Sequence, residues 1–167
     1  AAGADKYDGG VHSTQGAHVT LAMKEPFGVM GVICPEEAPL LGFVSTVLPA
    51  IAMGNRVVAV PSQSNPVAAL DFYQVLDTSD VPGGVVNIVT GPRAELADTL
   101  AKHDGVAALW AFADPAICEN ARAQSAGNLK PVWAETMVRD WSGAPGQSRE
   151  FLRRAVQVKT IWVPYGA

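Results

Sequence analysis

Short apolar runs alternate with segments of helical periodicity along most of this chain. A short apolar run without polar alternation indicates a strand that is buried on both faces of a sheet. Helices between such strands imply right-handed βαβ crossovers and a parallel sheet covered on both sides. The pattern therefore predicts a doubly wound, Rossmann-like α/β fold with a five-stranded, mostly parallel sheet. Its predicted strands span 29–34, 56–60, 85–89, 106–112 and 131–134, and its helices span 40–52, 65–76, 93–103 and 114–126.

Prolines mark the expected irregularities of these helices. Pro49 lies inside the first helix and should kink or interrupt it, because proline has no N–H to donate. Asn65 should cap the second helix ahead of Pro66, and Asp114 should cap the fourth ahead of Pro115. The residues of the second helix expected to face inward are Ala69, Phe72, Tyr73 and Leu76.

Two more strands are predicted outside the alternating series. Val19, Leu21 and Met23 share one face of a segment with the period of a strand, and residues 158–163 form a final apolar strand. We expect these two strands to form a small β-flap, because an exposed strand has to be paired or covered. The candidate interface residues on this flap are Val19, Leu21, Ile161, Trp162 and Tyr165.

The predicted elements divide the chain into three parts. Residues 1–27 form an N-terminal loop and the first flap strand, and residues 28–141 form the α/β domain. Residues 142–167 contain a Gly- and Pro-rich linker at 142–146, a short helix at 150–156 and the last flap strand.

Composition agrees with a packed domain and excludes several function classes. Hydrophobic residues make up 49% and charged residues 17%, which is typical of a buried α/β core. The net charge of −4 gives no basic surface for nucleic acid, and the apolar runs are shorter than the ~18 residues of a membrane span. The three histidines are dispersed, so we expect no metal site. The chain lacks an initial Met, so we expect it to be a fragment of a longer protein. Cys34 and Cys118 show no disulfide or metal spacing, so we expect a cytoplasmic protein.

Three motifs, in order along the chain, carry a family resemblance. They read EPFGVMGVICP at 25–35, LPAIAMGNRVV at 48–58 and VPGGVVNIVTG at 81–91. Together they resemble the cofactor-binding domain of aldehyde dehydrogenases over roughly residues 5–135. The segments DKYDG at 5–9 and KTIWVPYG at 159–166 resemble more specifically the C-terminal, degenerate domain of family 16 aldehyde dehydrogenases.

The resemblance implies catalytic groups that this chain lacks. The family's nucleophilic cysteine follows the motif containing Glu135 by a few dozen residues, but no cysteine follows Glu135 here. Glu37 stands where the family has an oxyanion-hole asparagine, and a carboxylate has no proton to donate to an oxyanion. From the residues alone, Glu36 and Glu37 are interpreted as a charged turn at a helix start. Cys34 and Cys118 are interpreted as small core residues.

The positions that would hold a dinucleotide are also altered. Val60 replaces the family's lysine for the adenosine ribose. Asp114 and Pro115 stand where the family has a free helix N-terminus for the pyrophosphate, so a carboxylate cap would occupy the anion site. We therefore expect no bound cofactor.

Glu135 alone matches the family's general base, as a vestige without a nucleophile to serve. The resemblance implies a catalytic domain after this motif, whereas here the linker leads directly to the last strand. The sequence thus predicts a non-catalytic segment that supports the structure and oligomerisation of a larger aldehyde dehydrogenase. Its expected partners are the catalytic domain of its own chain, a second copy, or both. The alternative is a vestigial nucleotide-binding regulatory module.

Overall fold

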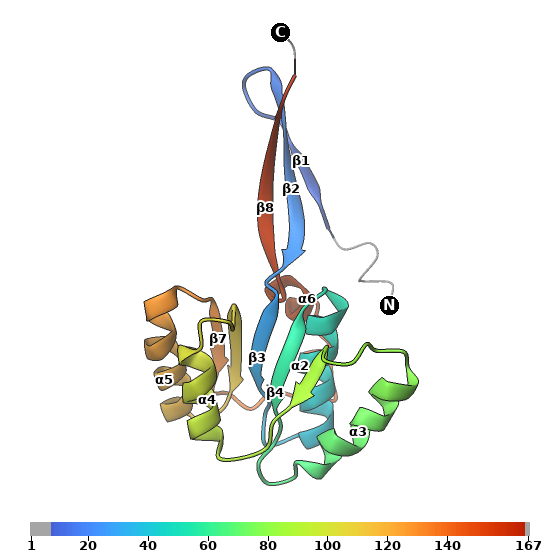
Figure 1. The fold of residues 1–167 in the computed structure, drawn as a ribbon, viewed down its shortest axis with the longest axis vertical. Helices are drawn as coiled ribbons and strands as arrows, with labels where there is room; N and C mark the ends of the chain where they lie inside the picture. The colour runs from blue at the N-terminus through green and yellow to red at the C-terminus, as the bar shows by residue number, and fades with distance from the viewer. Residues whose placement is uncertain (1–7, 166–167) are drawn as a thin grey trace.

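The computed structural model describes residues 8–165 and divides them into an α/β domain and a long antiparallel flap that extends away from it (Figure 1). In the domain, five strands form one sheet in the order β5-β4-β3-β6-β7, with every neighbouring pair parallel. This confirms the predicted doubly wound α/β fold. The strands are β3 (Val29–Ile33), β4 (Arg56–Val60), β5 (Val86–Ile88), β6 (Ala108–Phe112) and β7 (Val132–Glu135).

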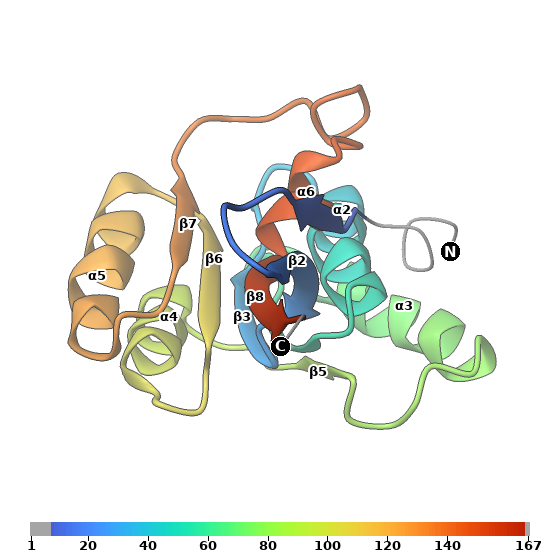
Figure 2. The same ribbon diagram turned by 90° about the horizontal axis from the view of Figure 1, so that it is seen from above.

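Helices cover the two faces of the sheet, as Figure 2 shows from above. Helices α2 (Pro39–Ala52) and α3 (Val67–Thr78) lie on one face, and α4 (Arg93–Lys102) and α5 (Pro115–Ser125) on the other. A 3-10 turn, η1 (Ala126–Asn128), extends α5. Each face has its own apolar core, which is why the strand sequences are apolar throughout.

Two helix predictions need correction. Helix α2 continues through Pro49 to Ala52, so the proline does not interrupt it, and Val47 and Ala50 on either side are buried against the sheet. Helix α3 has Pro66 at its N-cap without a side-chain cap, and Asn65 instead donates its backbone N–H to Ser62 Oγ. Among the residues expected to face inward, Ala69 and Leu76 are buried and Phe72 packs against the core, but Tyr73 is exposed.

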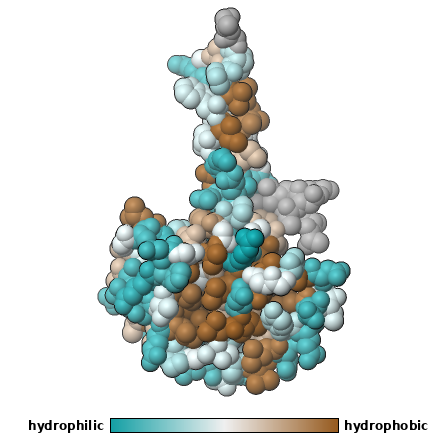
Figure 3. Space-filling view, viewed as in Figure 1, coloured by the Kyte–Doolittle hydropathy of each residue, from teal (hydrophilic) through white to brown (hydrophobic). Residues whose placement is uncertain are grey.

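The flap has three strands: β1 (Gly10–His12), β2 (His18–Pro26) and β8 (Val156–Pro164), in the order β1-β2-β8. Pairing of the two terminal strands is confirmed, whereas β1 was expected to be loop. The predicted last helix is shorter, because α6 (Glu150–Arg154) ends before β8 begins at Val156. Figure 3 shows hydrophobic side chains along the flap, separate from those on the domain.

The flap joins the domain at the buried side chain of Asn55. Asn55 Oδ1 accepts hydrogen bonds from the N–H groups of Phe27 (2.8 Å) and Gly28 (3.2 Å), just after β2. Asn55 Nδ2 donates to the carbonyls of Ala50 (2.9 Å) and Ala155 (2.8 Å), and Ala155 immediately precedes β8. One amide therefore holds the roots of both long flap strands.

Residues 136–155 form the whole connection from β7 to β8. The sequence suggested a linker at 142–146, but the flanking Trp141 and Phe151 are 4% and 1% exposed. Their rings pack against each other and against Phe112 of β6, and Phe151 also contacts Trp133 of β7. The connection thus covers the part of the sheet formed by β6 and β7. No helix within residues 8–165 is both long and apolar enough to cross a membrane.

Candidate functional site

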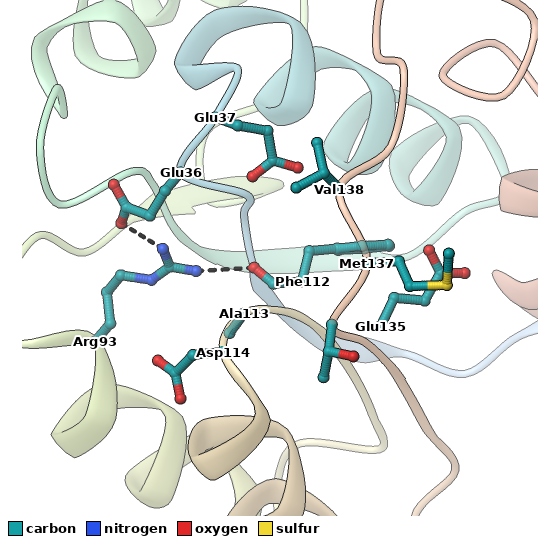
Figure 4. Close-up of a pocket in the computed structure, with 10 residues that line it drawn as sticks. Glu36, Glu37, Arg93, Phe112, Ala113, Asp114, Glu135, Met137 and Val138 are labelled. Atoms are coloured by element: carbon teal, nitrogen blue, oxygen red, sulfur yellow. Dashed lines mark hydrogen bonds and ion pairs between the residues drawn. The ribbon is translucent and has the colours of Figure 1, made fainter.

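The loops that follow the strands meet at the carboxyl edge of the sheet. Chain order reverses between β3 and β6, and ligands of doubly wound folds bind at such a switch point. A cavity of about 270 Å³ lies there (Figure 4). It is lined by Glu36, Glu37, Arg93, Phe112, Ala113, Asp114, Glu135, Thr136, Met137 and Val138.

The side chain of Arg93, at the start of α4, fills the crevice between β3 and β6. Its Nη2 donates to the carbonyl of Cys34 (2.7 Å) and to that of Phe112 (2.9 Å), which stand at the ends of these two strands. Its Nη1 forms an ion pair with Glu36, as Figure 4 shows. Only 7% of the side chain is exposed. The switch-point crevice is therefore occupied by the protein's own guanidinium group.

Glu36, in the loop after β3, is held by the loop after β4. Its carboxylate accepts hydrogen bonds from Ser62 Oγ (2.7 Å), from the N–H of Gln63 (2.7 Å) and from both the N–H and Oγ of Ser64 (3.2 and 2.9 Å). Burial alone would raise the pKa of Glu36, but these hydrogen bonds outweigh it and lower the pKa to about 2. Glu36 is consequently ionised at neutral pH and remains a charged partner for Arg93.

Glu37 lies beside the cavity with its carboxylate committed to a distant residue. Its Oε1 accepts a hydrogen bond of 2.8 Å from Trp141 Nε1. Glu36 and Glu37 form a charged bend just before α2 begins at Pro39, as the sequence suggests, but neither is in the first turn of the helix and neither caps it. Both carboxylates instead bind groups that the fold brings from other loops.

Asp114 caps α5 as the sequence predicts. Its Oδ1 accepts the N–H of Ile117 at 3.0 Å, and Pro115 occupies the first helical position. The carboxylate satisfies a free N–H of the helix and places negative charge at the positive end of the helix dipole. This helix start, which lines the cavity, has an anionic group of the chain itself where a bound phosphate would otherwise be favoured.

Glu135, at the end of β7, is enclosed by Arg139. Arg139 Nη2 donates to both carboxylate oxygens at 2.6 and 2.7 Å, and Trp133 Nε1 donates to Oε1 at 3.0 Å. The guanidinium of Arg139 also lies 5.1 Å from the ring centre of Phe151. Both carboxylate oxygens of Glu135 therefore already accept hydrogen bonds from the chain itself.

The other residues singled out from the sequence lie elsewhere. Val60 is buried in the core between the sheet and α4. Cys34 is fully buried, and burial raises the pKa of its thiol to about 12. Burial also raises the pKa of Cys118. Neither thiol therefore has the thiolate character of a nucleophile. Val19, Leu21, Ile161, Trp162 and Tyr165 belong to the flap, at the opposite end of β3 (Figure 1).

The structure thus brings Glu37, Asp114 and Glu135 around one cavity and adds Arg93, which sequence reasoning did not single out. The available signal was a charged residue directly after the Gly91-Pro92 turn, at the start of a helix whose apolar stripe does not need it. Within residues 8–165 no cluster of three or more His, Cys, Asp or Glu side chains could hold a metal ion.

Comparison with known proteins identifies what this chain resembles. The sequence profile described as the aldehyde dehydrogenase family matches residues 1–140. The chain is 33% identical over 133 residues to the NADP/NAD-dependent aldehyde dehydrogenase PuuC of Escherichia coli strain K12, covering 78% of this chain and 27% of that protein. It is 36% identical over 103 residues to retinal dehydrogenase 2 of Mus musculus, covering 62% of this chain and 20% of that protein.

Solved structures agree with the sequence comparison. The crystal structure of lactaldehyde dehydrogenase from Escherichia coli matches with a TM-score of 0.76 at 27% identity, over 80% of this chain and 28% of that one. PnpE from Pseudomonas sp. WBC-3 matches with a TM-score of 0.75 at 30% identity, over 79% of this chain and 27% of that one. The chain therefore spans only about a quarter of the length of these relatives.

Proposed function

This chain belongs to the aldehyde dehydrogenase family, and we propose that it is a non-catalytic domain that serves the structure and oligomerisation of a larger aldehyde dehydrogenase. The observation that carries the proposal is the connection between β7 and β8. The resemblance implies a catalytic domain after the Glu135 motif, but residues 136–155 alone lead from β7 to β8. In this segment the connection takes the place of the domain that would supply the nucleophile.

The connection also engages the remaining acidic groups of the site. Its Arg139 binds the Glu135 carboxylate, and its Trp141 donates to Glu37. Removing a single oxyanion donor already costs on the order of 3 kcal/mol of transition-state stabilisation, and Glu37 offers no donor to replace one. These contacts support a stable fold in which neither acid is available for chemistry.

The flap supports the assembly role. Several of its apolar side chains are exposed, among them Trp162 at 67% and Val163 at 47%. In sheet register, Val19 and Leu21 lie opposite Val163 and Ile161, so these four share one face of the flap. A partner that covers exposed apolar surface of this kind lowers the free energy of the complex by removing that surface from water.

The family 16 resemblance suggests which larger protein this is. We propose the C-terminal domain of a two-domain dehydrogenase whose first domain is complete, with that domain or a second copy as the partner. Of the segments behind this proposal, residues 5–7 and 166 lie outside the described residues. The other part, Lys159–Tyr165, contains most of β8.

Sedimentation velocity tests the assembly role. At concentrations on the order of tens of micromolar, we expect the chain to self-associate or to bind the preceding dehydrogenase domain. A monomer that binds neither would contradict the proposal.

An aldehyde oxidation assay tests the absence of catalysis separately. With NAD or NADP as the oxidant, the wild-type chain should form no more reduced cofactor than the Cys34→Ser/Cys118→Ser control. A higher rate in the wild type would show that one of its thiols is a nucleophile.

Calorimetric titration with NAD, NADP and ADP addresses the alternative, a nucleotide-binding regulatory module, which is favoured only by the cavity at the carboxyl edge. Saturable heat at millimolar ligand would support that alternative.

A further inference from the structure

The crevice occupied by Arg93 is lined by three hydrogen-bond acceptors, two from the loop after β3 and one from the end of β6. Two of them are the main-chain carbonyls of Cys34 and Phe112, and the third is the carboxylate of Glu36. We call these three acceptors the guanidinium pocket. Cys34 directly follows β3 and Phe112 ends β6, and these strands pair in parallel up to Ile33 and Ala111, so the sheet brings both carbonyls to its carboxyl edge.

The rest of the surroundings is negative as well. Glu37, Asp114 and Glu135 line the adjoining cavity, and among the residues that line it Arg93 is the single cation. The Glu36 carboxylate is held in place by Ser62, Gln63 and Ser64 independently of Arg93. The pocket should therefore keep its shape and its negative potential when the arginine side chain is removed.

The acceptors match the donors of a guanidinium ion. Guanidinium is planar and carries its N–H groups in a fixed fork, which suits a carboxylate beside two carbonyls. A phosphate group would instead face carbonyl and carboxylate oxygens, and Coulomb repulsion between anions is strong in a partly buried site. The chemistry of the pocket thus favours a cation where doubly wound folds commonly bind an anionic nucleotide.

We propose that the switch-point crevice is a guanidinium-binding site that the chain fills with its own Arg93. When that side chain is removed, the pocket binds a free guanidinium or monosubstituted alkylguanidinium ion, and it does not bind a nucleotide. The inference goes beyond the proposed assembly role and does not depend on it, because it concerns the opposite end of the domain from the flap.

Chemical rescue of the Arg93→Ala variant tests this proposal. With methylguanidinium chloride at about ten times its dissociation constant, the folding equilibrium constant of the variant should increase about elevenfold, seen as a rise of about 4 °C in Tm. Wild-type protein, whose pocket is filled, should show no rise. Ammonium chloride at the same ionic strength should have no comparable effect on the variant, because it lacks the planar fork.

A second substitution tests the role of the carboxylate. The apparent affinity of Arg93→Ala/Glu36→Gln for methylguanidinium should be at least tenfold lower than that of Arg93→Ala, because a charge-assisted hydrogen bond is lost. If Arg93→Ala does not fold alone, the readout is refolding, which methylguanidinium but not ammonium should restore. Equal effects of methylguanidinium on variant and wild type, or no rescue, would overturn the proposal. Stabilisation of Arg93→Ala by NAD or ADP instead of methylguanidinium would overturn it too.

Discussion

Strand β3 connects two regions that differ in whether their side chains find partners within the chain. At its carboxyl end, the charged groups of the crevice bind one another: Arg93 pairs with Glu36, and Asp114 caps its own helix. At its amino end, the chain continues into the flap, where Val163 and Trp162 are largely exposed. The charged groups of the crevice thus have their partners within the chain, whereas Trp162 and Val163 of the flap stay exposed within residues 8–165.

The two regions therefore differ in how much free energy a ligand or partner would gain by binding there. A ligand entering the crevice would have to displace hydrogen bonds already made, so it would gain little on balance. A partner covering the flap would bury apolar surface worth about 25 cal/mol per Å². A three-stranded ribbon without a covered hydrophobic face also gains stability from such contact. We therefore expect changes in the two regions to have separable effects.

The largest effect is expected where the connecting segment seals the domain. Phe151→Ala should lower the free energy of unfolding by about 4 kcal/mol, because it empties a space among packed aromatic rings. Urea denaturation measures this, with Trp162→Ala on the exposed flap as the matched control. A decrease in the free energy of unfolding of less than about 1 kcal/mol would mean that residues 136–155 contribute little to covering the apolar face of the sheet.

A flap substitution should affect association and leave the domain intact. Val163→Asp places a charge on the face shared with Leu21 and Ile161, and it should weaken association about 30-fold, the effect of losing one strong contact. Sedimentation equilibrium measures the change. Thr160→Asp on the opposite face is the control. An equal loss for both variants would indicate association through the β8 edge, and a larger loss for Thr160→Asp would indicate association through the other face.

The smallest effect concerns acid stability of the crevice. The pKa of Glu36 is about 2 in the folded chain, below its ordinary value of 4.5. Its stabilisation is therefore fully present above pH 4.5 and is lost as the pH falls towards 2. The side chain is 38% exposed, so after allowance for solvent screening we expect Glu36→Gln to lose about 1 kcal/mol at neutral pH.

Comparing wild type with Glu36→Gln across the pH range isolates this carboxylate from the other acids. The difference in unfolding free energy should shrink as the pH falls below 4.5. A difference that stays constant down to the lower pKa would show that Glu36 acts by its shape and not by its charge.

The sequence was sufficient where the determining contacts are local. The apolar runs predicted all five sheet strands, since burial on both faces leaves no polar alternation. The cap at Asp114 was predictable because its partner, the N–H of Ile117, is three residues away. Pairing of β2 with β8 is the exception: the two strands are distant in sequence, and their pairing was expected because both lie outside the βα series.

The arrangement of the crevice was out of reach because its contacts are distant in sequence. Arg93 bonds to Cys34, Glu36 and Phe112, and no local pattern links these positions. Trp141 and Phe151 flank a segment whose Gly and Pro content indicated a linker, yet the sheet buries them. Strand β1 was missed because three residues beginning with glycine carry too little pattern.

The hold of Asn55 on both flap roots has a consequence for the order of folding. Strands β2 and β8 are separated by the whole α/β domain, so their first contact closes a very long loop, and contacts of that kind slow folding. Once the domain has formed, Asn55 brings Phe27 and Ala155 together, and the loop is already closed. Pairing can then proceed from Pro26 and Val156 outward to His18 and Pro164. Hydrogen exchange should accordingly be slowest at the root of the flap and fastest at its tip.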